Sequence, residues 1–211
     1  VSHSYASGDV TGTGYPVGGL IGYAHENVSY SYATGDVTGN AWVGGLVGVT
    51  LENVSHCYAT GDVNGGVRVG GLVGYAVGQV SNCHANGNVN GEFYVGGLLG
   101  TSDEKVSYSY ATGDVTGIGD KNYGGLIGYN NKAFITNCYA NGDVDGYKNV
   151  GGLIGENEGN ISQCHATGDV TGDEMNGGLV GVNIGTVSYC YATGDVNGDD
   201  VVTGSGSSLT F

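Results

Sequence analysis

The sequence predicts an all-β fold, a parallel β-solenoid (β-helix) of about eight coils of 26–29 residues. A twelve-residue block recurs eight times, with starts at residues 1, 28, 54, 80, 106, 135, 161 and 187. A fixed period of this length indicates a solenoid, propeller or array, and a propeller blade needs about 40 residues. Glycine recurs four to five times in each unit, which disfavours helix, whereas the abundant Val, Tyr and Thr favour strands.

The repeats define the domain organisation. Residues 1–198 form eight repeats, of which the last is incomplete, and residues 199–211 form a C-terminal tail or cap. The tail is either a loose linker or a cover for the last coil through Val201, Val202, Leu209 and Phe211. Because the chain begins on the first residue of a repeat, we expect it to be a piece of a longer protein.

The first block of each repeat reads V-S-x-[SC]-[YH]-A-x-G-[DN]-V-x-G and is predicted to form one wall of the coil. Side chains alternate between the two faces of a strand. Ser2, Ser4 and Ala6 therefore share the interior face, where small residues suit a narrow core. His3 and Tyr5 share the exterior face.

The second block reads Gly-Gly-Leu-[IVL]-Gly and is predicted to form the opposite wall. Its leucines, together with the Val10 position, are expected to supply the core: Leu20, Leu46, Leu72, Leu98, Leu126, Leu153 and Leu179. The residue after each leucine is also apolar, and strand parity would turn one of the two stripes outward for lateral pairing. Repeat length varies only in two segments, exemplified by Ile118–Tyr123 and Tyr129–Phe134, which we expect to be corners or loops.

The second block also resembles a known family. Gly19-Leu-Ile-Gly22, Gly45-Leu-Val-Gly48 and five later copies resemble the GLUG motif, which is named for Gly-Leu-any-Gly and occurs in large bacterial surface and adhesin-like proteins. The resemblance covers residues 1 to about 198 and implies a secreted or surface-exposed stalk or adhesive region. It does not imply the peptidase activity of some family members, because the sequence has no His-Glu-x-x-His.

The charge balance excludes several partners. The chain carries 20 acidic and 5 basic residues, a formal net charge of −15. The basic residues are scattered singly, so nucleic acid and anionic lipid are poor partners. No apolar run approaches the ~18 residues of a transmembrane helix, so we expect no membrane insertion in this segment.

Aspartate occupies one repeat position in seven of eight copies, with Asn88 in the other. Stacked carboxylates repel by about 1 kcal/mol per pair in water. Ca²⁺ would offset this repulsion, but Gly-Asp turns that accept backbone N–H groups explain the pattern better. Asp195, Asn197 and Asp199 match the opening of an EF-hand-like loop, although Asp200 replaces its glycine. We therefore expect no cofactor, with Ca²⁺ as the one candidate ion.

Cysteine and histidine show no catalytic pattern. The five cysteines share one repeat position with serine, which favours buried thiols, and disulfides between neighbouring coils are the alternative: Cys57, Cys83, Cys138, Cys164 and Cys190. Four of the five histidines stand where tyrosine is usual. The sequence therefore predicts that the chain is not an enzyme.

The variable segment before Gly-Gly-Leu carries large side chains that would line one edge of the rod: Tyr15, Trp42, Phe93, Tyr94, Tyr123, Tyr147 and Met175. Aromatic ridges bind glycans and protein partners. The alternative is that they fold back to shield a corner of the core.

These observations predict a non-catalytic, extracellular or cell-surface structural or adhesive region whose partner is a protein or glycan on a surface. A filament subunit that stacks end to end is the alternative. Glycan binding and ice binding rank lower, since an ice-binding threonine array would be broken by Ser7, Asn86 and Asn141.

Overall fold

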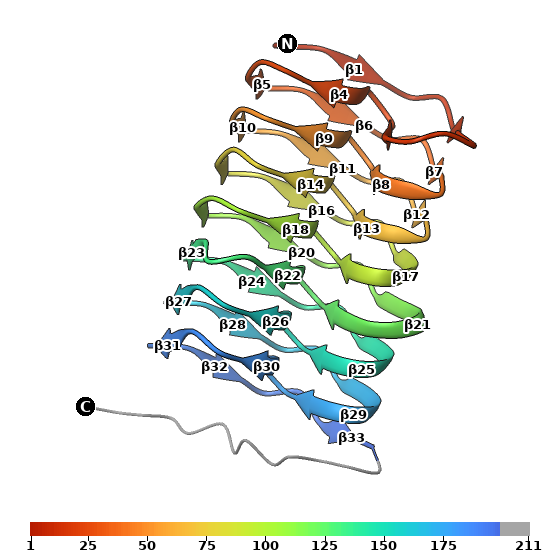
Figure 1. Ribbon diagram of the computed structural model, residues 1–211. Helices are drawn as coiled ribbons and strands as arrows, with labels where there is room; N and C mark the ends of the chain where they lie inside the picture. Colours follow the sequence, from red (N-terminus) through yellow and green to blue (C-terminus); the bar gives the residue numbers. More distant parts are fainter. Residues whose placement is uncertain (199–211) are drawn as a thin grey trace.

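The computed structural model describes residues 1–198, and within this range they form a parallel β-solenoid without a helix (Figure 1). The predicted fold class is confirmed. One sheet contains a strand from all eight repeats, whereas two others contain seven strands, so the rod has about seven full turns and an incomplete eighth.

Each coil passes through four short parallel sheets, numbered here in the order in which the chain meets them from the second repeat onward. Sheet 1 comprises β5 (Val28–Ser29), β10 (Val54–Ser55), β15 (Val80–Ser81), β19 (Val106–Ser107), β23 (Phe134–Thr136), β27 (Asn160–Ser162) and β31 (Thr186–Ser188). Sheet 2 comprises β1 (Tyr5–Ala6), β6 (Tyr32–Ala33), β11 (Tyr58–Ala59), β16 (His84–Ala85), β20 (Tyr110–Ala111), β24 (Tyr139–Ala140), β28 (His165–Ala166) and β32 (Tyr191–Ala192).

The third and fourth sheets complete the coil. Sheet 3 comprises β2 (Val10–Thr11), β3 (Val17–Gly18), β7 (Val37–Thr38), β8 (Ala41–Gly44), β12 (Val63–Asn64), β13 (Val67–Gly70), β17 (Val89–Gly96), β21 (Val115–Gly124), β25 (Val144–Gly151), β29 (Val170–Gly177) and β33 (Val196–Asn197). Sheet 4 comprises β4 (Ile21–Ala24), β9 (Val47–Thr50), β14 (Val73–Ala76), β18 (Leu99–Ser102), β22 (Ile127–Asn130), β26 (Ile154–Asn157) and β30 (Val180–Asn183).

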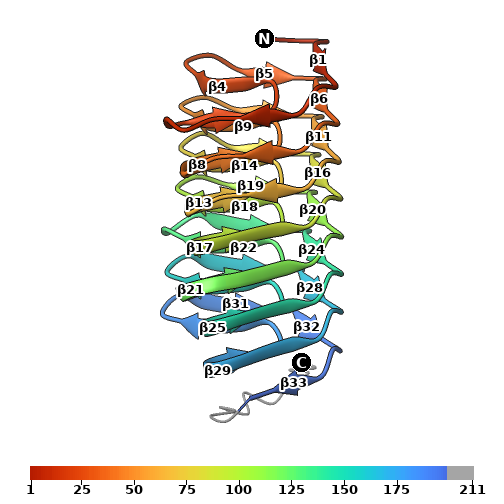
Figure 2. The same cartoon turned by 90° about the vertical axis from the view of Figure 1, so that its right-hand side faces the viewer.

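Equivalent repeat positions stack directly on one another. Tyr58 pairs with Tyr32 on one side and with His84 on the other, and the same register holds throughout sheet 2. Its strands consequently form a single column along the rod (Figure 2). Each side chain therefore meets copies of itself, or the residues that replace it, in the adjacent coils.

The predicted alternation holds in sheet 2 but not in sheet 1. The expectation that the Ser2 position faces the interior is wrong, because Val28 and Val54 are fully buried whereas Ser29 and Ser55 are partly exposed. The alternation therefore changes phase from sheet 1 to sheet 2. Between them stands one residue with a positive φ, such as Tyr30 at 49° or His56 at 55°. This left-handed residue turns the chain through a corner and directs its own side chain outward. Cys57 and Ala59 are buried on the interior face, as expected, while Tyr30 is exposed.

The interior is divided into two cores. The larger holds the Leu46, Leu72 and Leu98 row, and the smaller holds the valines of sheet 3, such as Val37 and Val43. The coil is pinched between them, because a Cβ on Gly45 would lie 2.9 Å from the Ala59 Cβ. Only glycine permits this approach.

The expectation that one apolar stripe faces outward is wrong for the inner coils. Leu46 and Val47 are both fully buried, as are Leu72 and Val73. The chain bends after Gly-Gly, and the N–H groups of Leu46 and Val47 both donate to the Leu72 carbonyl, at 2.9 and 3.1 Å. Two successive donors to one acceptor break the strand alternation, so both side chains point inward.

The two variable segments behave differently. The first was expected to be a corner, but β17, β21, β25 and β29 run through it as continuous strands, and a register irregularity between β17 and β21 absorbs the insertion at Ile118–Tyr123. The second, between sheets 4 and 1, is a turn, as predicted.

A row of buried asparagines closes this turn in the later coils. The Asn130 side chain donates to Asn157 Oδ1 at 2.6 Å, and the Asn157 side chain donates to Asn183 Oδ1 at 2.7 Å. Asn157 Oδ1 also accepts the Gly159 N–H, and its Nδ2 donates to the Gly159 carbonyl. Each side chain therefore satisfies its own turn and links two coils.

We expect Asn157→Ala to lower the free energy of unfolding by about 2–4 kcal/mol, because it leaves several buried polar groups without partners. Asn183→Ala is the matched control, since Asn183 is exposed and ends the row. Its expected loss is below about 1 kcal/mol. Guanidinium denaturation of both variants measures the difference, and equal losses would contradict this role for the row.

Candidate functional site

The predicted aromatic edge does not form one line. Tyr15 and Tyr147 are exposed, Trp42, Phe93 and Tyr94 are half-buried, and Tyr123 is fully buried in the smaller core. The register explains the scatter: Phe93 pairs with Val67 and Lys121, whereas Tyr123 pairs with Val95 and Val150. The expectation that Tyr123 belongs to a contact surface is therefore wrong.

The structure instead brings two columns of side chains together where sheet 3 meets sheet 4. The first column contains the positive-φ residues of sheet 3: Trp42, Arg68, Tyr94, Asn122, Asn149 and Met175. The second contains outward residues of sheet 4: Tyr23, Val49, Tyr75, Thr101, Tyr129, Glu156 and Val182. We call these two columns the corner face.

Backbone geometry builds this face. Trp42, Arg68 and Tyr94 have φ of 52°, 54° and 57°, the left-handed conformation that turns their side chains away from the smaller core. Their backbones press against the glycines of sheet 4, since a Cβ on Gly100 would lie 2.6 Å from the Arg68 carbonyl carbon. Each side chain of the first column is therefore held beside the second column.

The first half of the corner face is aromatic and contains one cation. The Arg68 guanidinium lies 4.9 Å from the Tyr75 ring centroid and 5.9 Å from that of Tyr94. Tyr94 in turn contacts Tyr129, with ring centroids 5.6 Å apart. Trp42, next to Arg68 in its column, meets Tyr15 edge-on at 5.3 Å. Cation–π contacts of this kind stabilise a half-buried arginine by about 0.5–2 kcal/mol.

Carboxylates hold the tyrosine hydroxyls of this face. Tyr75 donates to one oxygen of Asp103, whose other oxygen accepts from the Asn131 side chain at 2.9 Å. The Tyr129 hydroxyl donates to Glu158 at 2.8 Å. Burial, followed by the contact with Asp103, raises the pKa of Tyr75 to about 12. The hydroxyl therefore stays protonated and acts as a donor at neutral pH.

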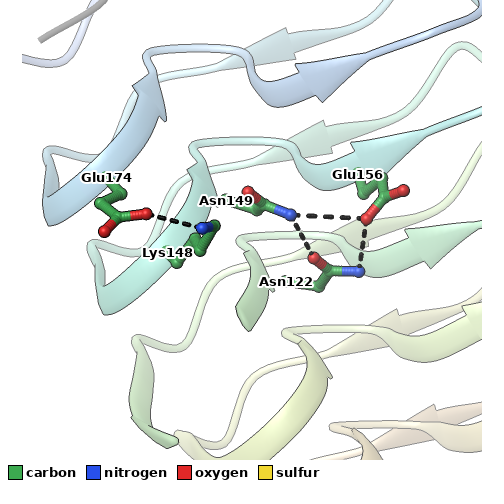
Figure 3. A network of polar contacts seen from close by, with 5 residues as sticks. All are labelled: Asn122, Lys148, Asn149, Glu156 and Glu174. Carbon is green, nitrogen blue, oxygen red and sulfur yellow. Dashed lines mark hydrogen bonds and ion pairs between the residues drawn. The ribbon is translucent and has the colours of Figure 1, made fainter. Parts of the chain in front are cut away.

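The second half of the corner face is a polar network (Figure 3). The Asn122 amide donates to Glu156 Oε2 at 3.0 Å, and the Asn149 amide donates to Asn122 Oδ1 at 2.7 Å and more weakly to Glu156 Oε2 at 3.4 Å. Asn122 and Asn149 are buried, and Asn149 Oδ1 has no hydrogen-bond partner. Lys148 and Glu174 form an adjacent ion pair at 2.6 Å.

A second aromatic feature is the continuous ring stack of sheet 2. Adjacent rings from Tyr5 to Tyr191 have centroids 4.7–5.3 Å apart and planes within 10° of parallel. Because the rings cover one another's faces, they present only edges along the rod. This stack is therefore suited to stabilising the coils, whereas the corner face leaves aromatic surface uncovered.

The aspartate column has a structural explanation. Asp9 Oδ1 accepts the Asp36 N–H at 2.9 Å, and Asp36 Oδ1 accepts the Asp62 N–H at 2.8 Å, in a chain that continues to Asp195. Asn88 takes part identically, accepting from Asp114 at 3.0 Å. Backbone N–H acceptance was the predicted role, although the donor belongs to the next coil. These bonds offset the repulsion between the exposed carboxylates.

We expect Asp62→Asn to leave the free energy of unfolding within about 0.5 kcal/mol, because the amide oxygen keeps the bond to the next coil. Asp62→Ala should cost about 1 kcal/mol, since the Asn88 N–H loses its acceptor. Denaturation curves of the pair test this, and a large loss in the asparagine variant would show that the charge itself is needed.

The calcium candidates are only partly placed. Asp195 and Asn197 lie at the end of the last coil, where Asp195 donates its N–H to Asp169, and Asp199 lies outside the described residues. Among residues 1–198, no group of three or more His, Cys, Asp or Glu side chains has a metal-binding arrangement. Within that range there is also no helix long and apolar enough to cross a membrane.

We expect the thermal midpoint to change by less than about 2 °C between excess chelator and millimolar Ca²⁺, because the aspartates already bond to backbone. A mass-action gain of 2.7 kcal/mol would require Ca²⁺ at about 100 times its dissociation constant. Differential scanning calorimetry decides this, and a rise of many degrees with Ca²⁺ would mean that the carboxylate column binds metal.

The cysteine position has the role that serine plays in other coils. Cys57 Sγ lies 3.2 Å from the Ser55 carbonyl, just as Ser31 Oγ donates to Ser29 at 2.8 Å. The Cys57 N–H lies 3.4 Å from Cys83 Sγ in the next coil. All five cysteines are free thiols, four of them buried. The hydrogen bond with Cys57, followed by burial, raises the pKa of Cys83, so it stays a thiol.

Sequence reasoning missed Arg68, Tyr75 and Tyr129 at the corner face. The available signal was that Tyr75 and Tyr129 share the position after Gly-Leu-x-Gly with Tyr23. The sequence could not reveal that this position lies against the segment before Gly-Gly-Leu, because the contact depends on how sheets 3 and 4 meet.

Comparison with known proteins identifies one family. A family model described as the GLUG motif matches residues 13–38, 39–64, 65–90, 91–116, 119–145, 146–171 and 177–197. No curated protein and no solved structure matches the chain. The seven matches cover most of the sequence and confirm the resemblance inferred from the Gly-Leu-x-Gly blocks. The chain therefore belongs to the GLUG-motif family.

Proposed function

We propose that this chain is a non-catalytic structural or adhesive rod of an extracellular or cell-surface protein. The observation that carries the proposal is the register of the coils, which stacks equivalent residues along the described length in sheets 1, 2 and 4 and shifts in sheet 3 at the insertion in β21. Eight rungs at ~4.8 Å give a rod roughly 35–40 Å long. Such an element supplies reach and repeats each exposed group at every rung.

The surface chemistry supports this role. Columns of exposed hydroxyl and carboxylate side chains run along the rod, exemplified by Thr34, Asp36 and Thr38 in one coil. The net charge of −15 favours solubility and disfavours nucleic acid and anionic membranes as partners. The half-buried aromatic and polar corner face provides the surface best suited to a specific contact.

Surface exposure on intact producing cells tests the proposal. Antibodies against the rod should label unpermeabilised cells, and external protease should remove the signal while a cytoplasmic marker protein stays intact. Labelling that appears only after permeabilisation would overturn an extracellular location.

An end-to-end filament is a second candidate, favoured by one observation. At the first coil, a hollow of about 330 Å³ opens beside Val10, Tyr15, Pro16 and Val17. Unpaired strand edges and uncovered apolar residues at a solenoid end promote pairing with another chain. Light scattering across a concentration series separates the candidates: rods of increasing mass favour the filament, and a constant monomer mass favours the stalk.

A further inference from the structure

We propose that the corner face around Arg68 binds an oligosaccharide that carries a single carboxylate, such as one with a terminal uronic or sialic acid. This inference rests on the proposed adhesive function and names its ligand class. Arg68 is half-buried, and its Nε atom is buried with no hydrogen-bond partner. Among residues 1–198 the one ion pair is Lys148–Glu174, so Arg68 has no carboxylate within 4.0 Å.

The neighbouring carboxylate is already engaged. Asp103 accepts from Tyr75 through one oxygen and from Asn131 through the other. The Tyr75 and Tyr94 rings position the guanidinium by cation–π contact. A planar guanidinium fixed in this way is suited to bidentate recognition of an external carboxylate.

The aromatic side chains favour a sugar as the carrier of that carboxylate. Trp42 and Tyr94 flank Arg68 in the same column, one rung on either side, and both are half-buried. Their rings are not stacked on equivalent rings, unlike those of sheet 2. Rings that combine apolar faces with polar edges suit a pyranose, which presents C–H groups and hydroxyls together.

The polar half of the face favours a ligand rich in O–H donors. Asn149 Oδ1 is a buried acceptor with no partner, Thr101 Oγ1 is likewise unpartnered, and both bonds made to the Glu156 carboxylate use Oε2. The Asn149 and Glu156 oxygens can only accept, and the Thr101 hydroxyl can donate or accept. Each saccharide hydroxyl can donate to such an acceptor or accept from a donor, whereas a peptide N–H can only donate and its C=O can only accept.

The dimensions and the charge set the size of the ligand. Arg68 and Glu156 belong to coils three rungs apart, or about 14 Å, which is close to the length of a trisaccharide. Screening at physiological salt acts over ~8 Å, so the surrounding acidic surface still repels a polyanion near the rod. One carboxylate at Arg68 therefore fits better than a carboxylate on every sugar.

Trp42 provides the test, because it is the only tryptophan in the chain and lies next to Arg68. Its fluorescence is titrated with 3′-sialyllactose and with an aldotriouronic acid, each of which carries one carboxylate. Maltotriose is the neutral control, and N-acetylglycine, which has one carboxylate, is the carboxylate without a sugar. We expect a saturable emission change with at least one acidic trisaccharide, and at least tenfold weaker binding of both controls.

Variants assign the effect to Arg68. Arg68→Gln should weaken binding at least tenfold and Arg68→Lys should retain part of it, whereas Lys105→Gln, in the turn between sheets 4 and 1, should bind as the parent does. Circular dichroism establishes that each variant is folded. The inference would be overturned by no saturable change with either acidic trisaccharide or by equal binding of maltotriose. Tighter binding of N-acetylglycine, or unchanged binding by Arg68→Gln, would also overturn it. Surface labelling of cells is independent of all these outcomes and tests the proposed location separately.

Discussion

Gly113→Ala is expected to lower the free energy of unfolding by about 3 kcal/mol or more, at the upper end of overpacking effects. Gly113 is buried, and the backbone of the preceding coil lies where its Cβ would be. That Cβ would lie 2.5 Å from the Gly87 carbonyl carbon and closer still to the Gly87 carbonyl oxygen. Backbone atoms of a stacked coil cannot rotate aside as a flexible side chain does. The coils would have to separate locally.

Gly8→Ala is the matched control. Gly8 occupies the same repeat position in the sequence Tyr-Ala-Ser-Gly-Asp-Val, but no atom lies within 4 Å of where its Cβ would be. Its substitution should change stability by less than about 1 kcal/mol. Because unfolding of a repeat array can lose cooperativity, hydrogen exchange of the coils on either side accompanies guanidinium denaturation. Similar effects at Gly8 and Gly113 would refute coil-to-coil contact as the cause.

Much of the fold follows from period and parity. The recurrence of the Val1 block predicted one coil per repeat, and strand alternation correctly placed Ala59 inside and Tyr30 outside. Parity fails at Leu46 and Val47 because alternation requires a regular strand, and the chain bends there. A bend that lets two N–H groups share one carbonyl cannot be inferred from apolar residues in sequence.

Tyr123 shows a different limit. It occupies a position that is valine in the neighbouring coils. Its ring packs against Gly117 and Gly146, and a Cβ built on these glycines would lie 2.5 and 2.7 Å, respectively, from atoms of the ring. Its hydroxyl donates to the Glu92 carbonyl at 2.6 Å and accepts the Gly119 N–H at 3.0 Å. Gly119 belongs to the inserted segment, so the insertion and the buried tyrosine are linked. The insertion was readable from the sequence, but its role as a hydrogen-bond donor was not.

The candidate site was the least predictable part. An exposed aromatic position can be read from the repeat, but the pairing of Arg68 with Tyr75 joins two repeat positions on different sheets. Their proximity depends on the left-handed backbone of Arg68 and on Gly74 and Gly100, which leave room for that backbone against sheet 4. A sequence repeat predicts which residues stack on their equivalents in adjacent coils. It does not predict which columns of side chains contact each other.

Leu98→Ala is expected to lower the free energy of unfolding by about 2–5 kcal/mol, the range for truncating a buried leucine. Leu98 is fully buried at the centre of the larger core, and its N–H and carbonyl bond to Leu126 and Leu72 in the adjacent coils. The coils cannot close over the lost volume, because their spacing is fixed by continuous backbone hydrogen bonds on both sides. The cavity therefore persists, and the loss should fall in the upper part of the range.

Leu179→Ala separates core truncation from a general effect of losing a leucine from the Gly-Gly-Leu block. Leu179 has the same sequence context as Leu98 but is only partly buried, in the last such block of the rod. Its substitution should cost less than half as much, because the burial lost on truncation is smaller. Guanidinium denaturation followed by far-UV circular dichroism measures both. Equal losses of unfolding free energy in the two variants would mean that burial of the leucine side chain is not the cause. The leucines would then stabilise the coils in another way, such as through the turn that follows Gly-Gly.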